Sequence, residues 1–176
     1  DTTEQGSQTT LTVRGDGDPG FADPELLEMH ELSLEDVLSA WIGAVKKAGV
    51  QRVDRLVVDD RVFDRDYVHP TWPTDQLNRW YCAQIAGFNF NSNCFDVFPA
   101  PTGPGQSAAV RIYPEVSSLV ETNRSVTGKR DTFWIARKLG TNELIYNGKV
   151  RHRRTTPVYV TMHNPPDVFA RLLGDR

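Results

Sequence analysis

Residues 33–60 read SLEDVLSAWIGAVKKAGVQRVDRLVVDD, and this stretch decides the fold class. Across Leu34–Ala48 the apolar side chains recur at the 3.6-residue spacing of one helix face. Ser33 and Asp36 have the spacing of a capping box at the start of this helix, and Gly49 supplies its end. The stretch therefore predicts an amphipathic helix that packs on a sheet.

A strand is expected on each side of this helix. Thr10–Arg14 alternates between polar and apolar residues, and Val53–Val58 is a short apolar run. Strand, helix, glycine and strand in this order are typical of a βαβ unit, in which the two strands run parallel. The prediction is an α/β (α+β) domain built around this unit.

The second half of the chain shows a different pattern. A strand is expected across Phe88–Phe98, and the Pro- and Gly-rich stretch at residues 99–105 then breaks the chain. Short strands separated by turns follow, which predicts a small all-β subdomain: Ala108–Tyr113, Thr132–Ala136, Glu143–Lys149 and Thr156–Met162. Asn164 as the cap and Pro165 in the first turn predict a final helix.

Composition and charge narrow the class of protein. The 176 residues carry 20 basic and 23 acidic side chains, a net charge of −3, which argues against nucleic-acid binding. The only dense basic run, Arg151–Arg154, is interpreted as a solvated turn. The sequence contains no apolar run of 18 residues, so no membrane span is predicted. The chain begins at Asp1 without Met, which we interpret as a mature form or an excised fragment.

The sequence lacks the motifs of covalent catalysis. No serine is followed by lysine three residues later, the spacing that lets an amine accept the hydroxyl proton. The four histidines are scattered singly, and Cys82 and Cys94 lack the spacing of a four-ligand zinc site. We therefore expect no catalytic residue, metal or cofactor in this chain. The two cysteines either pair in an oxidising compartment or stay buried as free thiols.

Four segments together resemble the central region of the D-alanyl-D-alanine carboxypeptidase/endopeptidase family, the penicillin-binding protein 4 type of penicillin-recognising serine enzymes. They occur in the family's order over nearly the whole chain: Leu11–Pro19, Val53–Phe63, the loop Pro70-x-Trp72-Pro73 with Tyr81-x-Ala83, and Arg137–Leu144 with Gly148.

The resemblance implies a domain organisation. In this family a transpeptidase-like domain is interrupted by an α/β domain, in which a smaller β domain is nested. Residues 1–97 and 156–176 would form the α/β domain, and residues 98–155 the nested β subdomain. The serine and lysine motifs of the family belong to the flanks, which this chain does not contain.

The resemblance also implies a site and a substrate. The family hydrolyses D-alanyl bonds of peptidoglycan, and residues after its Asp-Asp pair help to form the pocket for the side chain of the stem peptide. The matching positions here are Asp60, Val62 and Phe63. A carboxylate suits an ammonium, and an aromatic ring suits methylene groups. The competing interpretation is a strand-end acid that caps a turn, with a core phenylalanine.

The first hypothesis is thus a non-catalytic inserted region that shapes the cleft of a periplasmic or otherwise extracytoplasmic serine hydrolase, with the peptidoglycan stem peptide as its partner. The alternative is a stand-alone binding module for cell-wall peptide, glycan or a protein partner. The sequence leaves the oligomeric state open.

Overall fold

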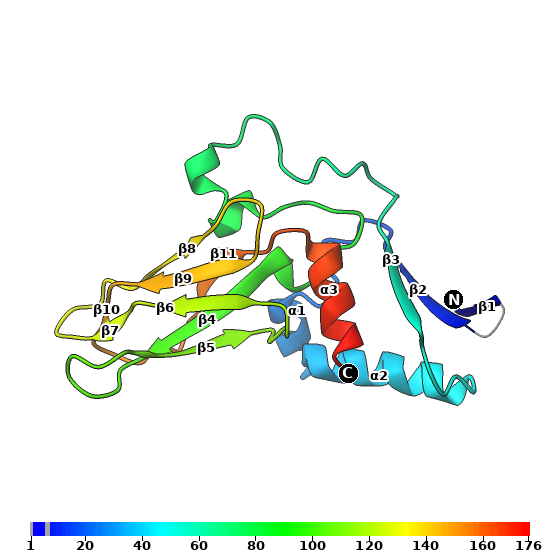
Figure 1. Ribbon diagram of the computed structural model, residues 1–176, viewed down its shortest axis with the longest axis horizontal. Coiled ribbons are helices and arrows are strands. Elements are labelled where there is room, and N and C mark those ends of the chain that lie inside the picture. Colours follow the sequence, from blue (N-terminus) through cyan, green and yellow to red (C-terminus); the bar gives the residue numbers. More distant parts are fainter. Residues whose placement is uncertain (1, 6–7) are drawn as a thin grey trace. The chain divides into compact units, whose positions relative to one another are not determined.

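The computed structural model describes residues 2–5 and 8–176. The chain forms two compact units (Figure 1). Unit 1 comprises residues 1–67, 85–93 and 164–176, and unit 2 comprises residues 68–84 and 94–163. Helices and strands both contribute, so the predicted mixed α and β fold class is confirmed.

Unit 1 contains the predicted βαβ unit. Strand β2 (Gln8–Arg14) pairs in parallel with β3 (Arg55–Asp59), while β1 (Thr2–Gln5) pairs antiparallel with the other edge of β2. Helix α2 (Leu34–Lys47) connects the two parallel strands. Two further helices complete the unit: α1 (Pro24–Met29) and α3 (Pro165–Gly174).

Helix α2 begins and ends as its sequence predicts. The Ser33 hydroxyl accepts a hydrogen bond from the Asp36 backbone N–H, and the Asp36 carboxylate accepts one from the Ser33 N–H. Leu34 and Leu38 are fully buried. After the helix, Gly49 adopts a φ of +86°, a left-handed conformation that favours glycine.

An aromatic cluster forms the centre of unit 1. Phe169 of α3 is completely buried, and its ring lies 4.4 Å from the Phe88 ring and 5.2 Å from the Phe90 ring, centroid to centroid. The Trp41 indole of α2 stacks on Phe21 at 5.2 Å and meets the edge of Phe169 at 5.8 Å. The two long helices are therefore held together by ring contacts.

The strand expected across Phe88–Phe98 is wrong in its first half. The strand β4 (Cys94–Ala100) starts only at Cys94, because Asn91, Ser92 and Asn93 adopt φ values near +50°. The asparagine side chains take over the hydrogen bonding of this segment: Asn89 Oδ1 accepts from the Ala86 N–H, and Asn93 Oδ1 from the Phe90 N–H.

Unit 2 is built from short strands in small sheets. The four strands expected there are present, although Gly148, with a φ of +89°, divides the third into β9 and β10. Three sheets form, with the orders β11-β4-β5, β6-β9-β8 and β10-β7. The strands are β5 (Ala109–Tyr113), β6 (Val120–Asn123), β7 (Val126–Thr127), β8 (Trp134–Arg137), β9 (Glu143–Asn147), β10 (Lys149–Val150) and β11 (Val158–Thr161).

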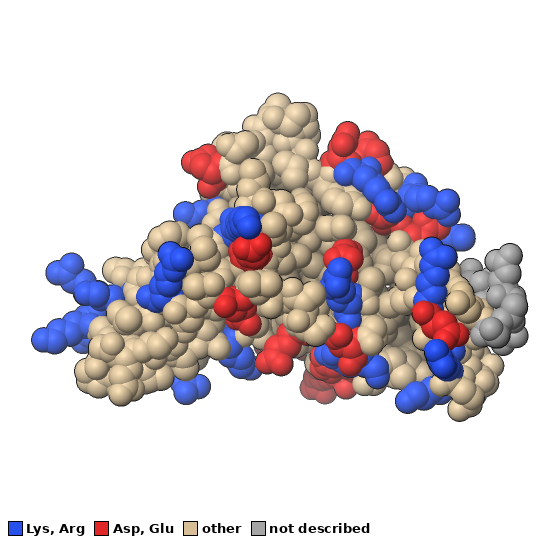
Figure 2. Space-filling model, viewed as in Figure 1, with Lys and Arg blue, Asp and Glu red and all other residues tan. Residues whose placement is uncertain are grey.

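Within the described residues, η1 (Thr74–Gln76) and η2 (Trp80–Cys82) are single-turn 3-10 helices, and the segment labelled η3 (Asn91–Asn93) is a turn with left-handed φ values. Cys82 and Cys94 are both buried and form no disulfide. The residues of the basic run at 151–154 are all exposed, and Figure 2 shows Lys and Arg side chains gathered at the end of unit 2 that carries β7 and β10.

The expected domain boundaries stay a prediction. They are an α/β domain at residues 1–97 and 156–176 and a nested β subdomain at residues 98–155. Among the described residues, no helix has the length and apolar character needed to cross a membrane.

Candidate functional site

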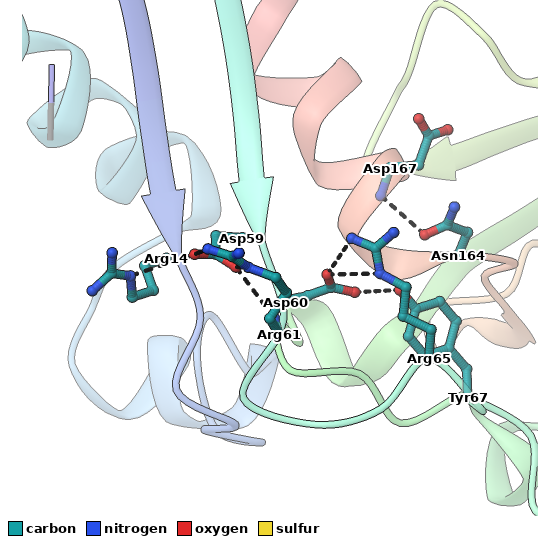
Figure 3. Close-up of polar contacts among 8 residues, drawn as sticks. All are labelled: Arg14, Asp59, Asp60, Arg61, Arg65, Tyr67, Asn164 and Asp167. Atoms are coloured by element: carbon teal, nitrogen blue, oxygen red, sulfur yellow. Dashed lines mark hydrogen bonds and ion pairs between the residues drawn. The ribbon is translucent and has the colours of Figure 1, made fainter. Parts of the chain in front are cut away.

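Charged side chains gather where β2 and β3 end (Figure 3). Arg14 is the last residue of β2, Asp59 is the last residue of β3, and the parallel register places them side by side. Because the carboxyl ends of parallel strands meet at one edge of a sheet, the charged residues at these ends lie together. The residues that follow β3 add Asp60, Arg61 and Arg65 to this cluster.

Asp59 is held by two arginines. The Arg61 Nε lies 2.7 Å from Asp59 Oδ1 and its Nη2 2.8 Å from Oδ2, a two-pronged contact, while the Arg14 Nε is 3.6 Å from Oδ2. The hydrogen bond from Arg61 holds the pKa of Asp59 far below its usual value. Asp59 is therefore a fixed anion between two cations.

Asp60 points inward and is only 1% exposed. Arg65 donates to Asp60 Oδ1 from Nη2 at 2.9 Å and from Nε at 3.2 Å, and the Tyr67 hydroxyl donates to Oδ2. Burial by itself would raise the pKa of Asp60, but the bonds from Tyr67 and Arg65 outweigh it and lower the pKa. Burial and the bond to Asp60 raise the pKa of Tyr67 to about 12.

Glycines let a third segment approach the strand ends. A Cβ on Gly87 would lie 2.0 Å from the Asp60 carbonyl oxygen, and one on Gly15 would lie 2.2 Å from the Gly87 oxygen. The Gly17 N–H donates to that same Gly87 oxygen at 2.9 Å, and the Ile85 N–H donates to the Tyr67 oxygen at 3.0 Å. Only glycine fits at positions 15 and 87 without moving the backbone.

The three residues expected at the site share one turn but face different surroundings. Asp60 is enclosed, whereas Val62 and Phe63 are 51% and 47% exposed. The Phe63 ring covers Gly17, where a Cβ would lie 2.6 Å from the ring. Beside Val62 lies an open cavity of about 370 Å³, which is also lined by Arg14, Gly15, Asp16, Asp59 and Arg61.

Sequence reasoning missed Arg14, Arg61, Arg65 and Tyr67 as members of this cluster. A signal for them exists: two arginines and a tyrosine follow the acid pair within seven residues, at DDRVFDRDY. The cluster offers fixed charge and exposed apolar surface, which suit binding. It contains no serine, cysteine or lysine that would act as a nucleophile.

A second buried carboxylate lies in unit 2. Asp96 in β4 is 8% exposed, and its Oδ1 has no hydrogen-bond partner within the described residues. Burial raises the pKa of Asp96 to about 6. Burial, together with the charge of Asp96, raises the pKa of Cys94 to about 12, so this thiol stays protonated at neutral pH.

The sequence matches the profile of the family described as D-Ala-D-Ala carboxypeptidase 3 (S13), over residues 1–176. The chain belongs to this S13 family. Among curated proteins, none matches it.

Solved structures give the same fold for this S13 chain. It is similar to penicillin binding protein 4 (dacB) from Haemophilus influenzae, with a TM-score of 0.66 and 17% identity over 98% of this chain and 37% of the other. The same protein complexed with a novel beta-lactam gives a TM-score of 0.51 and 17% identity, over 95% of this chain and 33% of the other. The chain thus spans about a third of the length of these structures.

Proposed function

We propose that this chain is the inserted, non-catalytic region of a serine-type D-alanyl-D-alanine carboxypeptidase/endopeptidase that acts on peptidoglycan. The observation that carries the proposal is the combination of a family match over residues 1–176 with a coverage of only 37% of a solved relative. The absence of any Ser-x-x-Lys sequence in the chain agrees with a nucleophile that lies elsewhere in the parent protein.

Within the parent, the turn after β3 would contribute to the substrate cleft. Val62 lines a cavity with a largely apolar surface, and Phe63, the next residue, has exposed apolar surface of its own. Both suit the methylene groups of a stem-peptide side chain. Asp60 already accepts hydrogen bonds from Arg65 and Tyr67. This favours a positioning role for Asp60, which would hold the turn rather than bind the ammonium of the peptide directly.

The proposed substrate, peptidoglycan, determines where in the cell the parent protein acts. Peptidoglycan lies outside the cytoplasmic membrane, so the proposed activity places the parent protein in the periplasm or another extracytoplasmic part of the cell envelope. The alternative function is a stand-alone module that binds cell-wall peptide, glycan or a protein partner. A reading frame without Ser-x-x-Lys and Lys-Thr-Gly motifs on either side of this sequence would favour that alternative.

Labelling with a fluorescent β-lactam tests the proposal. The 176-residue chain and the protein encoded by the whole reading frame are incubated with the label and analysed by intact mass. We expect an adduct on the longer protein, at a serine outside these residues, and none on the chain alone. A stoichiometric adduct on a serine of the chain would overturn the proposal.

The unlabelled parent protein tests whether the turn after β3 contributes to the cleft. Phe63→Ala in the parent should raise the KM for stem peptides with a long diamino-acid side chain about tenfold, the loss expected for one partly buried apolar contact. Acylation by a small β-lactam should stay unchanged, because such a label lacks that side chain. Tyr159→Ala, which changes a 48% exposed aromatic side chain outside this turn, is the matched control. Equal losses for peptide and β-lactam would make Phe63 a structural residue.

A further inference from the structure

A second surface of the molecule, separate from the turn after β3, carries exposed aromatic rings. It is a shallow pocket of about 250 Å³ in unit 2, between η1 and β8, lined mainly by Thr74, Asp75, Asn78, Trp134, Arg137 and Leu139. The Trp134 side chain is 53% exposed and Leu139 is 66% exposed. Large apolar side chains that gather at the surface mark a binding site more often than single ones do.

Two more exposed aromatic rings lie on η2, the segment that follows η1. The Tyr81 hydroxyl donates to the Gln76 Oε1 at 3.2 Å, which ties η2 to the end of η1. The Trp80 ring stands edge-on to the Tyr81 ring at 5.6 Å, and these side chains are 65% and 53% exposed. A second pair of exposed rings thus lies on η2, which the Tyr81 bond ties to η1, and η1 forms one wall of the pocket at Trp134.

The walls of the pocket are fixed by hydrogen bonds. The Arg137 Nη1 donates to the Thr141 oxygen at 3.0 Å and its Nη2 to the Leu77 oxygen at 2.8 Å. The Asn78 Nδ2 donates to the Ile135 oxygen at 3.0 Å, which orients the amide. These bonds join the η1 segment to β8 and to the turn after it, so the pocket needs little rearrangement to receive a ligand.

The charged residues at the pocket are Asp75 and Arg137, and the Arg137 guanidinium already donates to two backbone oxygens. Asp75 is exposed and takes part in no ion pair within the described part of the chain, and Thr74 and Asn78 add a hydroxyl and an amide. Residues 68–84 contain only two charged side chains, Asp75 and Arg79, and in Figure 2 the lobe at the top of the view is mostly uncharged. The surface therefore suits a neutral ligand with hydroxyl groups.

We propose that this surface binds a β-linked glycan of N-acetylated amino sugars. An indole face packs against the C–H face of a sugar ring, while a carboxylate and an amide bond its hydroxyl groups. The pocket is smaller than the usual site for a drug-sized molecule, in keeping with one sugar ring. Leu139 beside Trp134 offers an apolar contact for the methyl group of an acetamido substituent. The choice of the cell-wall glycan strand as the source rests on the proposed function.

Binding of a soluble oligomer tests the assignment. Titration of the 176-residue chain with the β-1,4-linked tetramer of N-acetylglucosamine, followed by calorimetry and by tryptophan fluorescence, should show saturable binding at submillimolar to millimolar concentrations. Cellotetraose, which has the same linkage but no acetamido group, should bind at least fivefold more weakly. Because the tetramer is neutral, 0.5 M NaCl should leave its affinity unchanged.

Two variants locate the site, and a third serves as the control. Trp134→Ala and Asp75→Asn should each weaken tetramer binding about tenfold, and both side chains are exposed enough that the fold should persist, which circular dichroism checks. Tyr159→Ala, a 48% exposed aromatic residue of the same unit that does not line the pocket, should bind normally.

Absence of saturable binding, full affinity in Trp134→Ala, or equal affinity for cellotetraose would each overturn the assignment. None of these results depends on the β-lactam test. Labelling of the parent with no glycan binding would reject the glycan site alone, and glycan binding by a chain that itself forms the adduct would reject the proposed function alone.

Discussion

Asp60 in unit 1 and Asp96 in unit 2 are both buried, with 1% and 8% of their surface exposed, yet their pKa values move in opposite directions. Asp60 accepts bonds from a guanidinium and a phenol, and its pKa is lowered. Oδ1 of Asp96 has no partner within the described residues, and burial raises its pKa to about 6. Partners, more than depth of burial, decide which charge state each site favours.

The contrast has consequences for stability. A carboxylate with a lowered pKa stabilises the fold above its unfolded pKa, and this contribution is lost as the pH falls through the folded value. A carboxyl with a raised pKa behaves in the opposite way, because its contribution is complete below the unfolded pKa of 3.8 and is lost as the pH rises through about 6. At neutral pH, Asp60 should therefore support the fold and Asp96 should weaken it.

The largest effect is expected from Asp60→Ala. This change removes the acceptor of the Tyr67 hydroxyl and of the Arg65 guanidinium, and we expect a loss of about 3 kcal/mol in the free energy of unfolding at pH 7. Urea unfolding measures it. The neighbouring Asp66→Ala, at an exposed position, should change stability by less than about 0.5 kcal/mol. Equal effects of the two changes would mean that burial and hydrogen bonding give Asp60 no special role in stability.

A gain in stability is expected from Asp96→Asn. Near pH 7.5 the ionised side chain is held in a site that favours the neutral acid, so its replacement should stabilise the fold by about 2 kcal/mol. The gain should disappear near pH 4, where Asp96 is protonated in the folded protein. Unfolding curves for both proteins across this pH range test the point, and a pH-independent loss of stability would contradict it.

The smallest effect concerns the phenol. Tyr67→Phe removes one hydrogen bond from Asp60 and leaves the Arg65 contact in place, so we expect a loss of about 1 kcal/mol. The pKa of Asp60, followed by carbon-13 NMR of its carboxyl group, should rise in this variant. If that pKa does not move, Arg65 alone sets the charge state of Asp60.

Local signals made most of the fold predictable. The Ser33–Asp36 capping pair and the Asn164 cap act within three residues, and both helices begin where those caps predict. The short α1 was missed, since its six residues contain too little periodicity to identify a helix. The strand expected to start at Phe88 was wrong because left-handed conformations at three consecutive residues override the alternation of side chains.

The site was harder to predict for a physical reason. The acid pair and the exposed Val62 and Phe63 lie in one local segment, so their neighbourhood could be predicted from the sequence. The inward orientation of Asp60 depends on Arg65 and Tyr67, and its carbonyl oxygen lies against Gly87, which comes from a segment 27 positions later. No spacing rule in the sequence predicts that Gly87 lies against the Asp60 carbonyl oxygen.

The hydrogen bond from the Ile85 N–H to the Tyr67 oxygen closes the base of the excursion formed by residues 68–84. A loop that is clasped at its base tolerates changes in length, because doubling the number of residues costs only about 0.6 kcal/mol of closure entropy. Exchange of the aromatic rings in this excursion should leave the packing around Asp60 and Gly87 intact, while Leu77 and Asn78 keep their bonds to Arg137 and Ile135. The aromatic residues Trp72, Trp80 and Tyr81 can therefore be substituted, in evolution or by design, while the geometry at the ends of β2 and β3 stays the same.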